Sequence, residues 1–388
     1  MITAPTDLLP VVAKERIART LAADRYLELP DPRLAAKDTT WRQKAVSRIV
    51  NGHARNIVGW DSFIESLREV HGTDHVVTFT ATLSSRLLVN VAGTALENGG
   101  LSLDRNTGQP CIPGSALKGI ARAQALRDLH NYEPADQPTQ LSIIADAFGW
   151  AAEDWSPKGD YGWALQHNAE HIAETKNQLA ASREHLSKTL PAHHSGSLNF
   201  LPAYPKTNAP LVADVLTPHH ADYYKGNRIL AIDDEQPNPI LFPAVEKGSQ
   251  WAFTIVARNT TGAEIIGIIA GILGTALKRG LGAKTAAGYG QFDNLSIDCE
   301  APLVWRTAKL TFNAPAFLAG ANPAKAEVRS ASLRGALRWW FRVVGGTSKE
   351  ETQLFGGLGA KNAVGKPTAA CLALNIRDVT PGPVWSGF

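Results

Sequence analysis

A six-residue motif, L-[KR]-G-x-x-R, occurs twice in this chain and constrains its fold more than any other feature. The first copy lies at residues 117–122 and the second at residues 333–338. Each copy follows a β-like segment, begins a predicted helix and precedes a Phe-Gly pair, at residues 148–149 and 355–356. Because the order of elements repeats together with the motif, we interpret the two regions as related modules.

Alternating and β-branched residues predict the strands of both modules. In the first module we expect strands at 76–83, 86–91, 240–245, 251–258 and 289–297. An apolar helix from about residue 263 to Arg279 precedes the last of these strands. The second module reads as a strand at 308–314, a helix at 332–344 and a strand at 373–376. Two strands and one helix make up only part of a domain, so we interpret the second module as incomplete.

The remaining segments indicate the domain organisation. Residues 1–74 are charged and predicted to be helical, with interruptions at Pro30 and Pro32. Residues 130–240 are irregular and rich in Pro, His and Asn, so we interpret them as a long insertion with one helix at 162–189. We therefore expect an α+β chain with three parts: a helical N-terminal extension at 1–74, a domain at 75–302 and a partial module at 303–388.

The distribution of charge is more informative than its total. The net charge is only +3. Between residues 306 and 342 a single acid, Glu327, accompanies seven basic residues: Arg306, Lys309, Lys325, Arg329, Arg334, Arg338 and Arg342. A local excess of this kind is typical of a surface that neutralises phosphate.

The cysteines and the hydropathy pattern argue against several classes of protein. Cys111, Cys299 and Cys371 are far apart, so neither a disulfide framework nor a zinc ribbon is predicted. The N-terminus lacks the basic start and apolar core of a secretory signal. The most apolar run, 265–277, is too short to span a bilayer. We expect a cytoplasmic protein with no membrane partner, no cofactor and no bound metal.

The first motif copy has the features of a phosphate-binding helix start. Free backbone N–H groups and the helix dipole favour an anion at such a terminus. Ser115 is the predicted N-cap, and Lys118 and Arg122, four residues apart, share one face of the helix. Gly119 permits close approach of a ligand to the backbone. The alternative is an ordinary helix start with two solvated cations.

The second motif copy carries a stripe of arginines. Arg334, Arg338 and Arg342 recur every four residues and therefore share one helix face. Trp339 and Trp340 lie between them, and exposed aromatic rings stack on the bases of single-stranded RNA. For either tryptophan, packing in the core is the alternative.

The glycine-rich loop from Gly280 to Gly290 differs from a nucleotide-binding loop. A Walker loop has glycine directly before Lys-[Ser/Thr] and joins a strand to a helix, whereas here Ala283 precedes the lysine and the loop joins a helix to a strand. We predict a backbone-lined groove for RNA phosphates, with a plain flexible connection as the alternative. The candidate residues are Lys278, Arg279, Gly282, Lys284, Thr285 and Tyr289.

Histidines supply the candidates for catalysis. His167, Glu170 and His171 match H-x-x-E-H, the pattern of inverted zinc hydrolases. The surrounding segment is polar and offers no third ligand, so an exposed helix is the default interpretation. Weaker candidates for acid–base chemistry on RNA are His193, His194, His219 and Asp214.

Three separated motifs, in order, resemble the RAMP superfamily of CRISPR proteins. They are IPGSALKG at 112–119, LVADVLTPHHADYY at 211–224 and the glycine loop at 280–290. Within the superfamily, the region from about 75 to 300 is similar to the sixth subunit of type III-B (Cmr) complexes. One departure is Pro202, where that family tends to carry an aspartate before Ala-Tyr-Pro, so the resemblance gives no support for an acidic role there.

From about residue 306 the chain resembles the opening of the first Cmr subunit. The resemblance rests on Glu327-Val-Arg329, the segment 332–342 and the Phe-Gly pair at 355–356, and it adds Arg329 to the candidate RNA-binding residues. It implies a ferredoxin-like (RRM-like) core in each module and a place near the 3′ end of the guide RNA. In this family, target cleavage is attributed to a different backbone subunit.

The resulting prediction is a structural, RNA-binding subunit of a type III CRISPR effector complex in antiviral defence. It would hold the 3′ region of the guide (CRISPR) RNA and the paired single-stranded target RNA by backbone contacts, beside other RAMP and small subunits. The alternative is a RAMP-type endoribonuclease that cleaves target or guide-precursor RNA. A third class, a protein-only scaffold, would show no salt-dependent RNA affinity.

Overall fold

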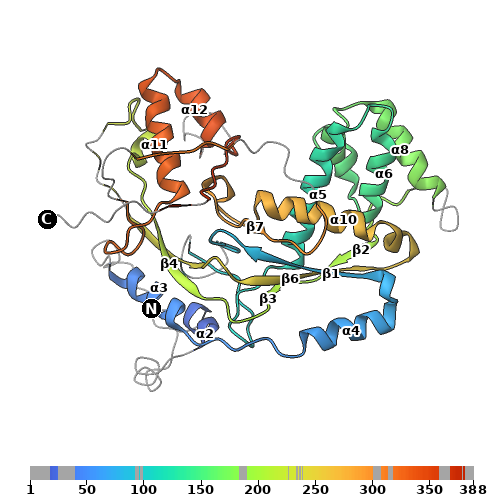
Figure 1. Ribbon diagram of the computed structural model, residues 1–388. Helices are drawn as coiled ribbons and strands as arrows, with labels where there is room; N and C mark the ends of the chain where they lie inside the picture. Colours follow the sequence, from blue (N-terminus) through green and yellow to red (C-terminus); the bar gives the residue numbers. More distant parts are fainter. Residues whose placement is uncertain are drawn as a thin grey trace.

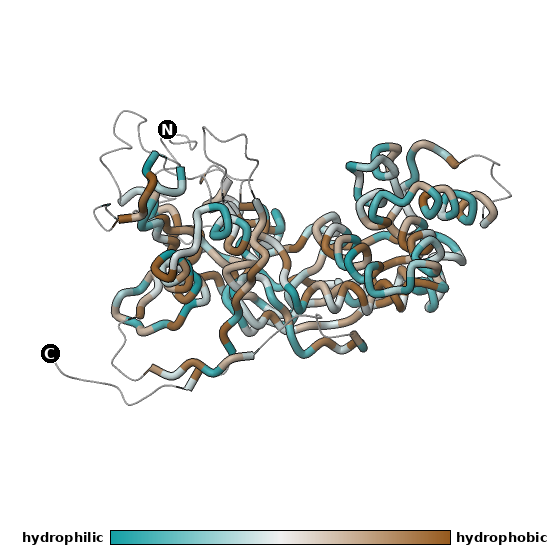
Figure 2. The backbone as a smooth tube through the Cα atoms, turned by 90° about the horizontal axis from the view of Figure 1, so that it is seen from above, coloured by the Kyte–Doolittle hydropathy of each residue, from teal (hydrophilic) through white to brown (hydrophobic). Residues whose placement is uncertain are grey.

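The structure is a computed structural model in which helices flank a central antiparallel sheet (Figure 1). It describes residues 18–24, 40–91, 96, 99–182, 190–225, 227–232, 235, 237, 239–299, 307–312, 318–357, 368–377 and 379–380. Seen from above, the molecule is elongated, with a helical lobe at one end (Figure 2).

The central sheet has five strands that pair antiparallel. They are β1 (Val76–Leu83), β2 (Leu198–Phe200), β3 (Tyr204–Pro205), β6 (Gln250–Ala257) and β7 (Phe292–Asp293). The order across the sheet is β2-β6-β1-β7, and β3 also pairs with β6. The long β1–β6 pairing runs from Val76 opposite Val256 to Thr82 opposite Gln250.

Two helices pack against this sheet. Helix α10 (Thr260–Arg279) contacts β1, β6 and β7, and α5 (Gly114–Asp128) contacts α10 and β2. Side chains alternate along a strand, so Phe79, Ala81 and Leu83 of β1 all enter the hydrophobic core together with Leu273 of α10. Along the chain the elements of this unit follow the order β1, α5, β2 with β3, β6, α10 and β7.

Helix α10 is longer than the apolar run at 265–277 that the sequence analysis considered. Its 20 residues are long and apolar enough to cross a membrane by length and composition. Half of its most apolar stretch of 18 residues is buried, and the helix packs on the sheet and on α5. This is the arrangement of a core helix.

A helical lobe covers one end of α5 (Figure 1). It contains α6 (Gln137–Phe148), α7 (Asp160–Ala164) and α8 (Ala169–Ala181). The segment 130–240, expected as an insertion, therefore contains this lobe, but it also supplies β2 and β3 to the central sheet. The prediction of a single helix at 162–189 was wrong, because α7 ends before a separate helix begins at Ala169.

A second sheet of two strands pairs β4 (Leu211–Leu216) with β5 (Ile240–Val245). Helix α3 (Thr40–Asn51) packs on both strands, and α2 (Arg19–Asp24) packs on α3. Helix α4 (Trp60–His71) precedes β1, and the short α9 (Ala221–Tyr224) follows β4. The described part of the N-terminal extension is thus helical, as predicted.

The C-terminal region contains α11 (Ser330–Val343) and α12 (Ser348–Phe355). These two helices repeat the order of α5 and α6. Both α6 and α12 end on a phenylalanine that is followed by a glycine. The backbone of each glycine is in the left-handed region, with φ of 80° at Gly149 and 74° at Gly356. The strand partners are not repeated. Within the described residues 307–312 and 368–377, neither predicted strand forms, and Leu310 and Phe312 are exposed.

The strongest sequence patterns are confirmed. Predicted strands at 76–83, 240–245 and 251–258 correspond to β1, β5 and β6, and the two predicted long helices correspond to α10 and α11. The segment 86–91 was wrongly predicted as a strand, since it makes one isolated bridge, Leu87 with Val245. The strand expected at 289–297 shortens to β7.

Candidate nucleic-acid interface

The first motif copy lies at the start of α5, where the predicted N-cap is corrected. Pro113 is the N-cap residue, and Ser115 is an exposed residue of the first turn that makes no cap hydrogen bond. Lys118 and Arg122 share one helix face, and Nζ of Lys118 donates to the Ser195 carbonyl oxygen at 3.1 Å. A loop before β2 therefore meets the motif.

Arg122 was predicted to bind phosphate, with a solvated cation as the alternative, but the structure pairs it with carboxylates. Its Nη2 lies 2.9 Å from Oδ1 of Asp154, and its Nη1 pairs with Asp160. The guanidinium also lies 4.7 Å from the ring centroid of Tyr161. Two carboxylates from the helical lobe thus balance this charge, so Arg122 joins α5 to the lobe.

Lys118 instead belongs to a basic cluster around Ser195, which we define as Lys118, Ser195 and Arg258. Nη1 of Arg258 donates to the Ser195 hydroxyl and, at 3.1 Å, to the Gly196 carbonyl. Burial lowers the pKa of Lys118, and the nearby charges of Arg122 and Arg258 lower it further. Among the described residues neither Lys118 nor Arg258 forms an ion pair, so the Ser195 cluster has uncompensated positive charge.

Arg258 was not among the predicted site residues. It follows β6 directly and is exposed there. The pattern that could have found it is a single cation at the end of an otherwise apolar strand.

Both motif glycines face open space. A Cβ added at Gly119 or at Gly335 would meet no heavy atom within 4 Å. Both positions are helical and exposed. Packing in the described part of the chain therefore does not require glycine at either position.

The glycine loop at 280–290 is more closely packed than the expected groove. The Ala283 N–H donates to the Leu88 carbonyl at 2.8 Å, and a Cβ at Gly282 would lie 2.2 Å from that same oxygen. A Cβ at Gly288 would lie 2.5 Å from the Leu374 carbonyl oxygen. These glycines permit close approach by other parts of this chain, which explains them without RNA.

The basic residues of the loop have separate surroundings. Lys278, at the end of α10, donates to the Cys299 carbonyl at 3.4 Å. Its neighbour Arg279 lies near Arg127 of α5, whose pKa is lowered by burial and by the charge of Arg279. Nζ of Lys284 lies 5.4 Å from the ring centroid of Phe242. Thr285 begins a short 3₁₀ turn and is half-buried.

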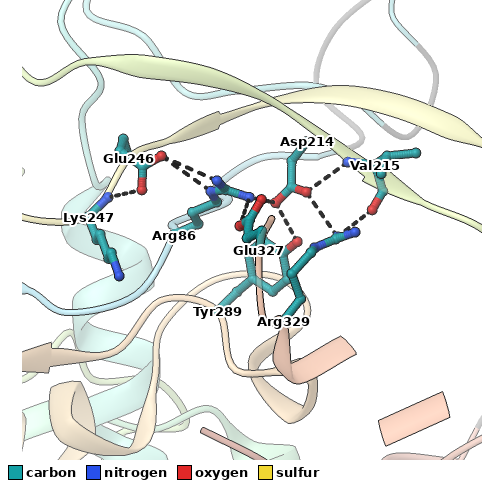
Figure 3. Close-up of polar contacts among 8 residues, drawn as sticks. All are labelled: Arg86, Asp214, Val215, Glu246, Lys247, Tyr289, Glu327 and Arg329. Carbon is teal, nitrogen blue, oxygen red and sulfur yellow. Dashed lines mark hydrogen bonds and ion pairs between the residues drawn. The ribbon is translucent and has the colours of Figure 1, made fainter. Parts of the chain in front are cut away.

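Asp214 in β4 is the centre of a buried charge network (Figure 3). Its Oδ2 lies 3.1 Å from Nη1 of Arg86 and accepts from the Tyr289 hydroxyl at 2.6 Å. Its Oδ1 lies 2.9 Å from Nη2 of Arg329 and accepts from the Val215 N–H at 2.7 Å. The carboxylate is fully buried and balanced by two guanidinium groups, so the suggested acid–base role of Asp214 is not compatible with its surroundings.

Tyr289 is corrected from an RNA-facing to a structural residue. Its ring is buried, and its hydroxyl is held by Asp214. Burial raises the pKa of Tyr289, and the adjacent Asp214 carboxylate raises it further. Arg329, also predicted to face RNA, is largely buried on the same carboxylate.

The arginine stripe of α11 is also occupied. Nε of Arg338 and Nη1 of Arg342 lie 2.8 and 2.9 Å from Oε1 of Glu351, which is buried in α12. The Tyr223 hydroxyl donates to the same carboxylate at 2.8 Å. Arg334 donates to the Phe355 carbonyl. These cations therefore join α11, α12 and α9.

The tryptophans between those arginines are accessible. Trp339 and Trp340 are 43% and 57% exposed, with ring centroids 4.9 Å apart in an edge-on pair. The core-packing alternative is therefore wrong for both residues.

The histidine candidates do not assemble. His167 precedes α8, whose N-cap is Asn168, so His167 and His171 do not share a helix turn as the zinc-hydrolase pattern requires. No group of three potential metal ligands occurs among the described residues. His193 and His219 are exposed, while Nε2 of His194 lies 3.9 Å from Oδ1 of Asp146.

The comparisons with known proteins agree with the resemblance that the motifs indicated. No protein-family profile matches the chain. It is 27% identical over 242 residues, covering 56% of this chain and 67% of the relative, to "CRISPR system Cmr subunit Cmr6" of Pyrococcus furiosus.

Among solved structures, a type III-B Cmr-beta complex bound to cognate target RNA contains a chain that is 20% identical, with a TM-score of 0.41 and coverage of 68% and 76% of the two chains. The crystal structure of Cmr6 from Pyrococcus furiosus is 22% identical, with a TM-score of 0.31 and coverage of 56% and 97%. On the sequence match and the ordered motifs at 112–119, 211–224 and 280–290, the chain is a RAMP-like protein of the type III-B (Cmr) CRISPR systems.

Proposed function

We propose that this chain is a non-catalytic RNA-binding subunit that holds the 3′ region of the guide RNA and the paired target RNA through their backbones. Its partners would be these RNAs and the other RAMP and small subunits of a cytoplasmic effector complex. The proposal also takes the domain at 75–302 as sixth-subunit-like and 303–388 as a fused, partial first-subunit-like module.

The proposed core of the domain is ferredoxin-like. Two observations support this: the chain order β1, α5, β2, β6, α10, β7, and the sheet order β2-β6-β1-β7. This is the split βαβ arrangement, in which each helix connects two strands that are separated by one neighbour.

The observation that carries the RNA proposal is Gly119 beside the Ser195 cluster. A glycine inside a helix costs about 0.5–1 kcal/mol relative to alanine. No described neighbour requires that glycine, and Lys118 next to it lacks a counter-ion. A phosphate lying against the helix surface would account for both features. Gly335 repeats the glycine in the second module, where the neighbouring cations are held by Glu351 and Phe355.

The test is equilibrium binding of labelled single-stranded RNA to the full chain over a range of salt concentrations. Each neutralised phosphate contributes a log–log slope of about −0.7 for a single strand. The double variant Lys118→Gln/Arg258→Gln should bind more weakly and show a shallower slope. The matched control Lys206→Gln/Lys247→Gln removes two exposed cations elsewhere. A flat salt response, or equal losses in both double variants, would contradict the proposal.

The second candidate function is a RAMP-type endoribonuclease that uses His194. Its support is one observation: His194 directly precedes Ser195 and lies near the Asp146 carboxylate. Incubation of the full chain with labelled RNA, with and without magnesium or a chelator, distinguishes this candidate. Cleavage that disappears in His194→Asn would replace the non-catalytic proposal.

A further inference from the structure

Two parts of the chain that are distant in sequence are joined by ion pairs around Asp214 (Figure 3). The domain at 75–302 contributes Arg86 and Asp214, and the C-terminal segment 318–357 contributes Glu327 and Arg329. Oε1 of Glu327 lies 2.8 Å from Nη1 of Arg86, and Nη2 of Arg329 lies 2.9 Å from Oδ1 of Asp214. Each part therefore supplies one cation and one anion to the other.

A second set of contacts lies at α9. Tyr223 donates to Glu351, and the guanidinium of Arg338 lies 4.5 Å from the ring centroid of Tyr224. The guanidinium of Arg342 lies 5.5 Å from the ring centroid of Tyr223. The two tyrosines thus contact Arg338 and Arg342, which are four residues apart on α11.

We infer that the surface formed by Arg86, Asp214, Tyr223 and Tyr224 is a docking site for a polypeptide that presents a glutamate and an arginine two residues apart, followed by a helix with arginines. In this chain the occupant is its own segment 318–357. The inference assigns Asp214 to protein docking, and it does not depend on RNA binding.

Charge selects a polypeptide over a nucleic acid at this site. Around Arg86 the domain places two carboxylates, Asp214 at 3.1 Å and Glu246 at 3.4 Å. A phosphate approaching Arg86 would be repelled by both, whereas Arg329 neutralises the buried Asp214. Removing one member of a buried ion pair leaves an uncompensated charge, so the guanidinium of the occupant is the group on which docking depends most.

The test uses the full chain with a specific protease site inserted between residues 300 and 307. After cleavage, the two pieces of the wild-type protein should stay together on size-exclusion chromatography at physiological salt. Arg329→Gln should weaken their association by about a hundredfold or more. The matched control Lys325→Gln removes an exposed cation of the same segment and should not weaken it.

Three further measurements make the test decisive. Glu327→Gln should also weaken the association, and circular dichroism of each uncleaved variant establishes that the fold is retained. A synthetic peptide of residues 318–357 should compete for the cleaved domain in the wild-type sequence but not with Arg329→Gln. Equal dissociation of the Arg329→Gln and Lys325→Gln pieces would overturn the inference. So would displacement of the segment by single-stranded RNA, because RNA would then share the Asp214 site.

Discussion

Nη2 of Arg329 lies 2.9 Å from Oδ1 of the fully buried Asp214, so a residue of the C-terminal segment neutralises a carboxylate in β4. Arg86 completes the charge balance from the loop after β1. The pairing occupies both carboxylate oxygens of the candidate catalytic aspartate, and it ties the second module to the first by a specific contact.

Replacing Asp214 with alanine should destabilise the protein strongly. The Arg329 guanidinium would remain largely buried without its carboxylate, while Arg86 would keep Glu246 and Glu327. Breaking a buried pair of this kind costs about 3–5 kcal/mol. Chemical denaturation followed by circular dichroism measures the loss. Asp298→Ala, at an exposed aspartate, should cost less than about 0.5 kcal/mol. A similar small cost for both variants would show that the network contributes little.

Replacing Gly119 with alanine should have opposite effects on stability and on RNA binding. Alanine favours the helix by about 0.5–1 kcal/mol, and open space surrounds the new methyl group, so the melting temperature should rise. RNA affinity should fall, because the methyl group would hold the phosphate away from the helix. The matched control Gly267→Ala, at an exposed glycine of α10 with equally open surroundings, should raise stability alone. Unchanged RNA affinity in Gly119→Ala would remove the main support for the RNA site.

RNA affinity should depend on pH through Lys118. The pKa of Lys118 lies below the ordinary lysine value of 10.5, so this side chain loses its proton earlier than an exposed lysine as the pH rises. Binding of phosphate favours the charged form, and affinity should therefore decrease as the pH increases from neutrality toward that value. Lys118→Arg should bind RNA without this decrease, because guanidinium stays protonated. Fluorescence anisotropy at constant ionic strength checks both; identical pH profiles would exclude Lys118 as a contact.

Trp339→Ala should weaken RNA binding without affecting the fold. The ring is exposed, and stacking of a base on an aromatic ring contributes about 1–3 kcal/mol. Val344→Ala, at an exposed apolar residue of the same region, is the matched control. Ultraviolet crosslinking of bound RNA, followed by mapping of the crosslinked peptide, locates the contact. Loss of α11 crosslinks in Trp339→Ala supports the prediction, and their persistence contradicts it.

The alternation of β1 and the apolar runs of β6 and α10 could be read from the sequence, because each of these elements buries its own pattern in one core. The internal repeat was equally readable, since α5 with α6 and α11 with α12 carry their boundaries locally, in the motif and the Phe-Gly ending. The strands expected at 308–314 and 373–376 did not form in the described residues. A strand is stabilised by a neighbouring strand, which local sequence cannot supply.

Tertiary structure alone decided which cations are available to a ligand. Lys118 and Arg122 carry the same charge on the same helix face, yet Arg122 is paired with Asp160, 38 positions away, and Lys118 has no such partner among the described residues. Arg338 was predicted to contact RNA, but α12 places the Glu351 carboxylate against it. The spacing of charges along a helix is a local property, whereas their neutralisation depends on which distant carboxylates the fold places within about 4 Å, because ion pairing is a matter of distance in space.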